Sequence, residues 1–197
     1  MLAELAPPRV ERAFGFVDLC GFTDFADAYG DDKAADVLRL LRASIREAAT
    51  YHGVRVDKWL GDGAMLVGVE TAALLAALVE VKWALPGRIT LCLRAGLAAG
   101  PVMVFEGDDY VGRAVNLAAK LCELAGADQI LAPAEAAQSC PVGLRAWPAG
   151  SRRVPGFAQP VELVRIDADD DPAGEHRRGL AAALADRVEE RRLGRLR

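Results

Sequence analysis

The sequence Gly61-Asp62-Gly63 places the strongest constraint on how this chain can fold. Two glycines around one aspartate are typical of a tight turn between two strands. Residues 53–60 alternate apolar and polar side chains before the turn, as a half-buried strand does, and the apolar residues 64–69 follow it. We therefore expect a β-hairpin with Asp62 at its tip.

Strand-like and helical segments surround this hairpin in a fixed order. Further strands are expected at residues 13–19, 89–105 (interrupted near Gly100-Pro101), 129–131, 152–154 and 161–166. Helices are expected directly after Gly21-Phe22-Thr23 and over residues 33–50, 71–83, 112–124 and 133–138. The order β-α-α-β-β-α-β, followed by α-β, indicates an α+β domain with a mainly antiparallel sheet, helices on one face and a ferredoxin-like core.

The segments outside this pattern divide the chain. Residues 1–12 predict a loose N-terminal lead-in, and residues 13–167 hold the domain itself. Residues 168–176 form an acidic linker. Residues 177–197 then predict a basic, amphipathic helix that packs on the domain or on a partner, with contact to a membrane surface as the alternative.

Composition excludes several classes of function. The net charge of −4 argues against a surface that binds nucleic acid. No stretch reaches the roughly 18 apolar residues of a membrane span, and the N-terminus lacks a signal-peptide pattern. The four cysteines lie far apart, so neither a zinc site nor a disulfide framework is expected. Reduced thiols fit a cytoplasmic location.

Two aspartates are the first candidates for chemistry. Asp18 ends a buried strand, and Asp62 lies at the hairpin tip, so an antiparallel sheet can bring them side by side. Two such carboxylates repel each other unless cations neutralise them, and a pair of Mg²⁺ or Mn²⁺ ions would do so. Two ions suit an in-line displacement at phosphorus. Taken alone, the spacing also fits Asp62 as a turn residue and Asp18 as a helix cap.

Four motifs decide between these interpretations. They are FVDLCGFT (16–23), KWLGDG (58–63), LRAGLAAGPV (93–102) and DYVGRAVNLAAK (109–120). In this order they resemble the motifs of class III adenylate and guanylate cyclases. One motif would be a weak signal, whereas four in the family's order, spread over most of residues 13–166, are specific. The resemblance implies the family's catalytic-domain fold.

The resemblance also assigns roles around the phosphates. Asp18 and Asp62 would hold two divalent metal ions, Mg²⁺ or Mn²⁺, one of which activates the ribose 3′-hydroxyl. Backbone N–H groups from residue 20 to Phe22 and Thr23, where a helix starts, would hold phosphate oxygens. Arg94 would neutralise the triphosphate.

Lys58 and Asp109 would read the base. Adenine offers an acceptor at N1 and a donor at its 6-amino group, which a lysine donor and an aspartate acceptor match, whereas guanine presents the reverse. Guanylate cyclases of this family carry glutamate where Lys58 stands. The resemblance therefore favours an adenylate cyclase that makes 3′,5′-cyclic AMP and pyrophosphate from ATP.

On the segment 109–120, Asn116 would orient the ribose. Lys120 stands where the family usually has arginine, and lysine lacks the planar fork that grips two oxygens, so we expect reduced turnover. Pro155 occupies the place of a late-strand lysine that contacts the triphosphate in many members, and Arg152 or Arg153 is the candidate to replace it. A weak or inactive nucleotide-binding regulatory module and a guanylate cyclase remain the alternatives.

The resemblance further implies a homodimer with its sites at the interface. In this family one subunit supplies the metal aspartates and the Arg94-type residue. The other supplies the residues equivalent to Lys58, Asp109, Asn116 and Lys120. The segment 101–109 is short, so the arm that embraces the partner is small.

Overall fold

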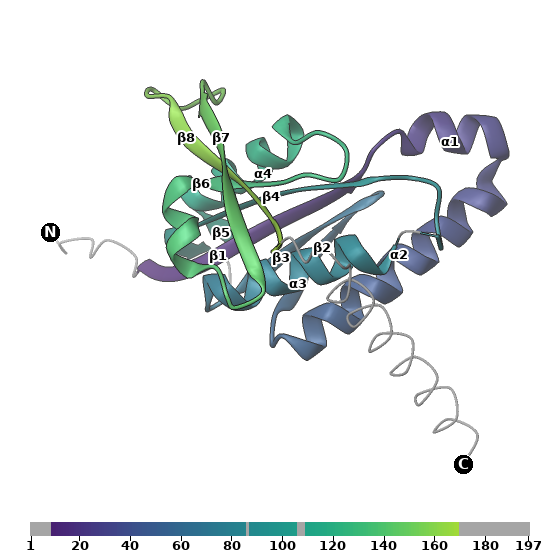
Figure 1. Ribbon diagram of the computed structural model, residues 1–197. Helices are drawn as coiled ribbons and strands as arrows, with labels where there is room; N and C mark the ends of the chain where they lie inside the picture. The colour runs from purple at the N-terminus through teal and green to yellow at the C-terminus, as the bar shows by residue number, and fades with distance from the viewer. Residues whose placement is uncertain (1–8, 86, 106–108, 170–197) are drawn as a thin grey trace, which may run out of the picture.

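The computed structural model describes residues 9–85, 87–105 and 109–169 (Figure 1). Its strands are β1 (Arg9–Leu19), β2 (Arg55–Leu60), β3 (Gly63–Gly68), β4 (Leu93–Phe105), β5 (Asp109–Val111), β6 (Ile130–Pro133), β7 (Leu144–Arg152) and β8 (Val161–Ala168). Its helices are α1 (Phe22–Tyr29), α2 (Asp31–Tyr51), α3 (Thr71–Ala84) and α4 (Arg113–Leu124), with the 3₁₀ helix η1 (Ala134–Ser139).

One sheet contains all eight strands of the described ranges, in the order β2-β3-β1-β4-β6-β8-β7, with β5 paired to β4. Among the described strand pairs, only β4 and β6 run parallel. The structure is therefore the mainly antiparallel α+β domain that the sequence predicts. β1 lies between β3 and β4, and β4 pairs with it along its whole length, from Arg9 to Leu19.

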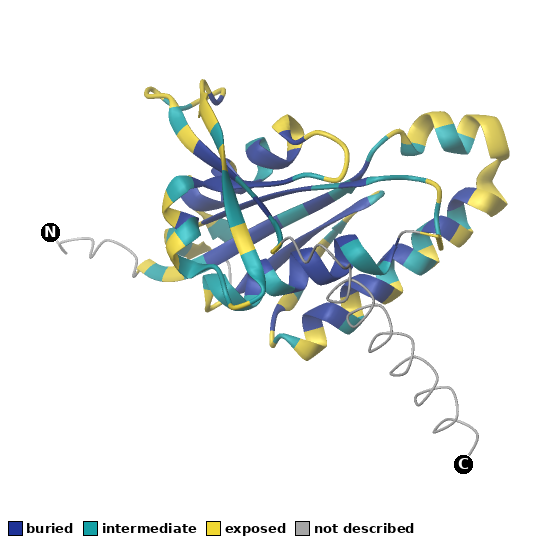
Figure 2. Ribbon diagram, in the orientation of Figure 1, coloured by how far each residue is buried: buried dark blue, intermediate teal, exposed yellow. Residues whose placement is uncertain are grey.

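Residues 13–17 of β1 form a continuous apolar run because both faces of the strand are covered there. Successive strand residues point to opposite faces. Val17 accordingly joins the apolar cluster beneath α2 and α3, and Phe14 joins the cluster beneath α4. Figure 2 shows this central strand as mainly buried between helices.

Helices cover both faces of the sheet, which corrects the expectation that they lie on one. α2 and α3 pack on one face and α4 packs on the other (Figure 1). Gly96 of β4 explains the position of α4. A Cβ atom at Gly96 would lie 2.2 Å from the backbone nitrogen of Cys122 and 2.3 Å from the carbonyl oxygen of Ala118. The glycine therefore lets α4 rest directly on the backbone of β4.

Several element boundaries differ from those expected. β1 begins at Arg9, inside the predicted lead-in, because residues 9–12 pair with β4. β4 begins at Leu93 and continues through Gly100-Pro101 without interruption. β7 precedes the strand expected at residues 152–154 and shares only Arg152 with it, so that expectation was wrong.

The predicted linker and C-terminal helix fall almost wholly outside the described residues, which end at Asp169. β8 ends at Ala168, one residue beyond the predicted end of the domain. In the part of the chain that the structure describes, no helix has the length and apolar character needed to cross a membrane.

Candidate active site

The register of three strands brings Asp18 beside the hairpin tip. Asp18 lies opposite Gly63 of β3 and, on its other side, opposite Arg94 of β4. A Cβ atom at Gly63 would lie 2.4 Å from the carbonyl oxygen of Val17 and 3.3 Å from Oδ1 of Asp18. Only glycine allows so close an approach. The strand end and the hairpin tip therefore lie side by side, as the sequence predicts.

Arg94 is the direct partner of Asp18. Its Nε and Nη2 atoms both donate to Asp18 Oδ2, at 2.9 and 2.5 Å. The hydrogen bond to Asp18 raises the pKa of the Arg94 guanidinium, which stays charged. Its Nη1 atom also donates to the carbonyl oxygen of Glu123, at the end of α4, over 3.5 Å. This pairing was not predicted from the sequence, in which the resemblance implies that Arg94 neutralises the triphosphate.

Asp62 feels the charge of Asp18 through space. Burial raises the pKa of the Asp62 carboxyl, and the negative charge of Asp18 raises it further, while its own backbone N–H and Arg94 act in the opposite direction. The Arg94 guanidinium binds Asp18 directly and acts on Asp62 only through its charge. The remaining negative charge makes this end of the sheet favourable for a cation.

These residues fit divalent metal ions by the chemistry of their donors. Mg²⁺ is usually bound through one or two carboxylates together with phosphate oxygens of a substrate, and Mn²⁺ prefers the same hard donors. Within the described ranges, no three His, Cys, Asp or Glu residues gather as a metal cluster. Asp18 and Asp62 therefore suit ions that also take oxygens from a nucleotide.

Phe22 and Thr23 open α1, directly after Gly21, whose φ of 74° favours glycine. The first N–H groups of a helix have no acceptor within the helix, so they point outward and can bind an anion. The N–H group of Cys20 is not available for this role, because it donates to the carbonyl oxygen of Cys92 at 2.9 Å. The expected phosphate cradle is thereby shortened to residues 21–23.

A second group of site residues forms where β5 meets β2. Lys58 and Asp109 make an ion pair although they lie 51 residues apart, and each side chain is about half exposed, at 45% and 50%. Asp109 begins β5. Tyr110 holds β5 in place. Its ring packs edge-on against Phe14, with centroids 5.2 Å apart, and its hydroxyl accepts from Arg55 Nη2 at 3.1 Å.

Asn116 and Lys120 lie one turn apart on α4. Asn116 is exposed, and Lys120 is paired with Glu123, its Nζ atom lying 2.9 and 2.7 Å from the two carboxylate oxygens. Within the described residues, neither side chain makes a hydrogen bond or ion pair with Asp18 or Asp62. Asn116 and Lys120 are therefore not linked directly to the two aspartates of their own chain.

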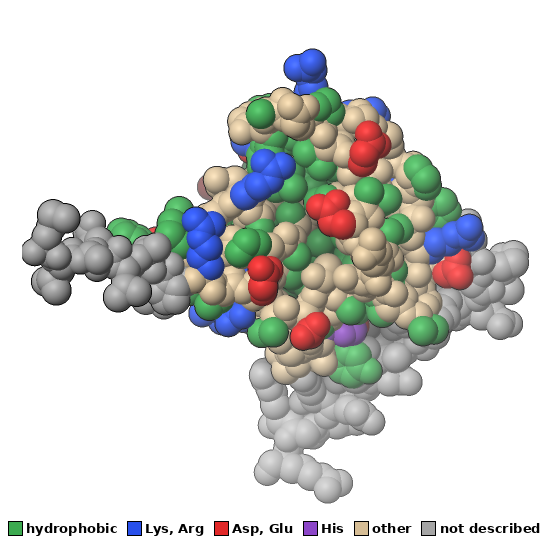
Figure 3. All heavy atoms as spheres, turned by 90° about the vertical axis from the view of Figure 1, so that its left-hand side faces the viewer, with side chains coloured by type: hydrophobic (Ala, Val, Ile, Leu, Met, Phe, Trp, Pro, Cys, Tyr) green, Lys and Arg blue, Asp and Glu red, His purple; other side chains and the backbone are tan. Residues whose placement is uncertain are grey.

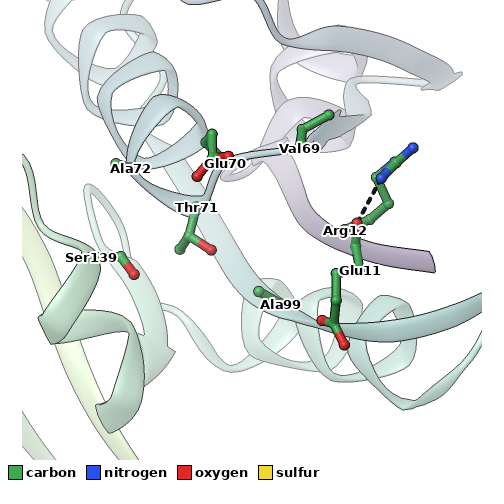
Figure 4. Close-up of a pocket in the computed structure, with 8 residues that line it drawn as sticks. All are labelled: Glu11, Arg12, Val69, Glu70, Thr71, Ala72, Ala99 and Ser139. Carbon is green, nitrogen blue, oxygen red and sulfur yellow. Dashed lines mark hydrogen bonds between the residues drawn. The ribbon is translucent and has the colours of Figure 1, made fainter.

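Two hollows lie elsewhere, and of the candidate site residues singled out from the sequence they include only Arg152. One, of about 260 Å³, lies at the start of α3 and includes Glu11, Glu70 and Ser139 (Figure 4). The other, of about 340 Å³, lies beside the end of α4 and includes Arg152 and Arg165. The face in Figure 3 carries basic and acidic side chains interspersed, without an extended basic patch.

Sequence reasoning missed the residues that support the two groups. Tyr110 and Trp59 lie inside the recognised motifs, yet nothing in the sequence marks their contacts. Arg42 and Arg55 lie outside the motifs. Arg42 contacts the hairpin and Arg55 contacts β5, and both contacts depend on tertiary structure.

Comparison with known proteins gives related sequences. No protein-family model matches the chain. An uncharacterized protein of Mycobacterium tuberculosis is 35% identical over 167 residues, which span 83% of this chain and 42% of that protein. Adenylate cyclase 2 of Rhizobium meliloti is 28% identical over 207 residues, 89% of this chain and 57% of that protein. The chain therefore spans about half the length of these curated relatives.

Solved structures show the same fold. The adenylyl cyclase CyaB from P. aeruginosa matches with a TM-score of 0.73 and 25% identity, over 85% of this chain and 98% of that one. The guanylate cyclase domain of RhGC from Catenaria anguillulae, in complex with GTP, matches with a TM-score of 0.73 and 16% identity, over 83% and 100%. Both kinds of cyclase share this fold, so the fold alone does not identify the nucleotide.

Proposed function

Because the chain belongs to the class III nucleotidyl cyclases, we propose that it is an adenylate cyclase, which converts ATP to 3′,5′-cyclic AMP and pyrophosphate. The observation that carries the proposal is the position of Asp18 beside the Asp62 hairpin, opposite Arg94. Two carboxylates and one guanidinium in this arrangement would suit a triphosphate and its cations.

Asp18 and Asp62 would hold two divalent ions, Mg²⁺ or Mn²⁺, which when bound lower the pKa of the ribose 3′-hydroxyl and neutralise the phosphates. The 3′-hydroxyl would lose its proton to solvent, its oxygen would form a bond to the α-phosphorus, and the bond from that phosphorus to the pyrophosphate oxygen would break. Arg94 would contact phosphate oxygens from beside Asp18. The N–H groups at Phe22 and Thr23 would hold others.

Lys58 and Asp109 would select adenine. Their ion pair shows that β2 and β5 bring a donor and an acceptor together in one chain. The lysine would donate to N1 of adenine and the aspartate would accept from the 6-amino group. The pair is exposed enough to open for a base, since contacts of this kind contribute at most about 1 kcal/mol.

A homodimer would complete the site. The resemblance assigns Asp18, Asp62 and Arg94 to one subunit and Lys58, Asp109, Asn116 and Lys120 to the other, so each set would face its counterpart on a second copy. Exposed apolar side chains on the β4–β5 ribbon support an interface there, namely Val104, Phe105 and Val111, with exposed fractions of 42%, 55% and 47%. On α4, Asn116 and Lys120 would then meet the ribose and phosphates bound to the partner.

A nucleotide-binding regulatory module without turnover is the second candidate. The observation that favours it is the ion pair between Lys120 and Glu123, because a lysine neutralised by its own helix contributes less charge to a phosphate. A guanylate cyclase is less favoured, since Lys58 presents a donor where guanine also presents one. We place the protein in the cytoplasm, and the free thiols of its four cysteines support this location.

The first experiment is to incubate the purified protein with ATP or GTP, in Mn²⁺ and then Mg²⁺, with Asp18→Ala as the control. Cyclic AMP that disappears in the variant would establish the cyclase and the role of Asp18. ATP binding without product, at high protein concentration, would instead select the regulatory module.

A further inference from the structure

Arg42 of α2 contacts the hairpin that carries Asp62 in two ways. Its guanidinium carbon lies 5.1 Å from the centroid of the Trp59 ring. Its Nη2 atom donates to the carbonyl oxygen of Gly61 at 3.4 Å. Gly61 immediately precedes Asp62 and has a φ of 63°, in the region that favours glycine. Arg42 therefore connects helix α2 to the backbone of the turn itself.

Arg46 provides an internal comparison one helical turn later. Its guanidinium carbon lies 5.0 Å from the same Trp59 ring. Among the described residues, however, only Arg42 of this pair hydrogen-bonds to the hairpin. Both arginines thus stack on the indole, and one of them also grips the turn.

The environment of Arg42 indicates that this contact serves more than packing. Its Nε atom is buried without a hydrogen-bond partner among the described residues, although buried polar groups are nearly always satisfied. A surface arginine could avoid this cost by turning toward water. The side chain instead remains over Trp59, where its terminal nitrogen reaches Gly61.

The hairpin tip needs such a restraint. Two glycines give the turn unusual freedom, and the carboxylates of Asp18 and Asp62 repel each other. On the β1 side, the register with Gly63 holds the turn close to Asp18. On the α2 side, the hydrogen bond from Arg42 opposes rotation of the Gly61 peptide, which directly controls where Asp62 points.

We propose that Arg42 is a positioning residue that holds the Asp62 carboxylate in the orientation needed to bind a divalent cation together with Asp18. The proposal rests on the proposed function, because it assumes a metal site at these aspartates. Arg42 touches neither substrate nor cation in this role. It acts through the Gly61 peptide.

The test measures Mn²⁺ binding directly, from the electron paramagnetic resonance signal of free Mn²⁺, with the full chain and a non-hydrolysable ATP analogue. We expect Arg42→Ala to weaken binding by about tenfold or more, the usual scale for groups that orient metal ligands. Arg46→Ala, which removes the other stacked cation, should bind within about twofold of wild type. Arg42→Lys should recover part of the affinity, since lysine can also donate to the Gly61 carbonyl.

Activity gives a second readout. Arg42→Ala should raise the metal concentration for half-maximal rate, while KM for ATP at saturating metal stays unchanged. If both alanine variants weaken Mn²⁺ binding equally, the arginines only pack on Trp59 and the proposal is wrong. Unchanged binding in Arg42→Ala would contradict it as well. If Arg42→Ala does not fold, Arg42→Lys is the test, because lysine can also donate to the Gly61 carbonyl. Mn²⁺ binding by Arg42→Lys within about tenfold of that by Arg46→Ala would support the proposal. Binding more than about tenfold weaker would contradict it.

Failure of the proposed function is distinguishable from failure of this inference. Asp62→Ala identifies how much Mn²⁺ binding depends on the site, without any turnover. A wild-type protein that binds Mn²⁺ through Asp62 and forms no cyclic nucleotide would contradict the cyclase, while the comparison of Arg42 with Arg46 would still support or overturn the positioning role.

Discussion

The Arg94 guanidinium binds the carboxylate of Asp18 through two nitrogens, Nε and Nη2, which lie 2.9 and 2.5 Å from Oδ2. An arginine in this place has two opposing effects on a metal site. It occupies an oxygen that a cation would use and repels the cation by its charge. It also attracts the phosphates that the cation must bind.

Arg94→Ala should therefore separate metal binding from catalysis. Without nucleotide, we expect Mn²⁺ to bind more tightly by up to about 1 kcal/mol, the scale of a partly exposed charge pair. Cyclic AMP production should fall, because the triphosphate loses its counter-charge. Titration with Mn²⁺ and a cyclase assay measure the two effects, with Arg12→Ala as a control distant from Asp18. Weaker Mn²⁺ binding in Arg94→Ala would show that the arginine instead organises the carboxylate for the metal.

The raised pKa of Asp62 predicts that the stability of the fold depends on pH. Its folded pKa is raised above the ordinary value of 3.8, mainly by burial, so the folded state binds the proton more readily than the unfolded state. The charged form therefore destabilises the fold above the raised pKa, and this cost disappears as the pH falls toward 3.8. We expect Asp62→Asn to raise Tm at pH 7 and to have little effect near pH 4. Equal effects of the substitution at both pH values would contradict this origin.

Lys58→Glu tests how the base is read. Reversing this charge removes the donor for adenine N1 and repels Asp109, so we expect kcat/KM for ATP to fall by about 100-fold or more, near 3 kcal/mol. Thermal unfolding should change little, because the ion pair is half exposed. Lys33→Glu, an exposed lysine on α2, is the matched control. Undiminished turnover of ATP by Lys58→Glu would remove Lys58 from the site.

Lys120→Arg tests the departure from the family's pattern. Arginine can grip two phosphate oxygens, so we expect turnover to rise by roughly tenfold, a barrier lower by about 1.4 kcal/mol. Glu123→Ala should give a smaller increase, because it releases Lys120 from its partner on the same helix. Steady-state rates at saturating ATP and Mn²⁺ measure both. A rate that stays unchanged in both variants would mean that this position does not limit turnover.

The cysteines should differ in reactivity. Burial raises the pKa of the Cys122 thiol to about 12, whereas Cys20, Cys92 and Cys140 are less buried and have pKa values raised to a smaller degree. At pH 8 we expect Cys122 to react slowest with a thiol reagent, because the thiolate is the reactive form. Mass spectrometry of the labelled peptides over time gives the order. Fast labelling of Cys122 in the folded protein would indicate local opening between α4 and β4.

Sequence reasoning succeeded where neighbours along the chain determine the structure. The two glycines around Asp62 predicted a hairpin, and the apolar run before Asp18 predicted a buried strand. Their mutual position followed from the sheet. The site could be predicted this far because a turn and a strand end are local features whose geometry the backbone largely determines.

The remainder depends on contacts between distant segments. The pairing of Lys58 with Asp109 requires the β4–β5 ribbon to reach β2, and the packing of Tyr110 on Phe14 brings it there. The binding of Arg94 to Asp18 depends on cross-strand register. The start of β1 at Arg9 depends on the length of β4. None of these has a periodic signal in the sequence.

The glycine at position 96 has a consequence for motion. Since no side chain fits between α4 and β4 there, the helix and strand are packed backbone to backbone and should move as one rigid body. Arg94 on the strand and Lys120 on the helix then keep a constant offset within one chain. In the proposed homodimer, opening and closing of the nucleotide site would therefore come from rotation of one subunit against the other, and an effector would act by changing the angle between them.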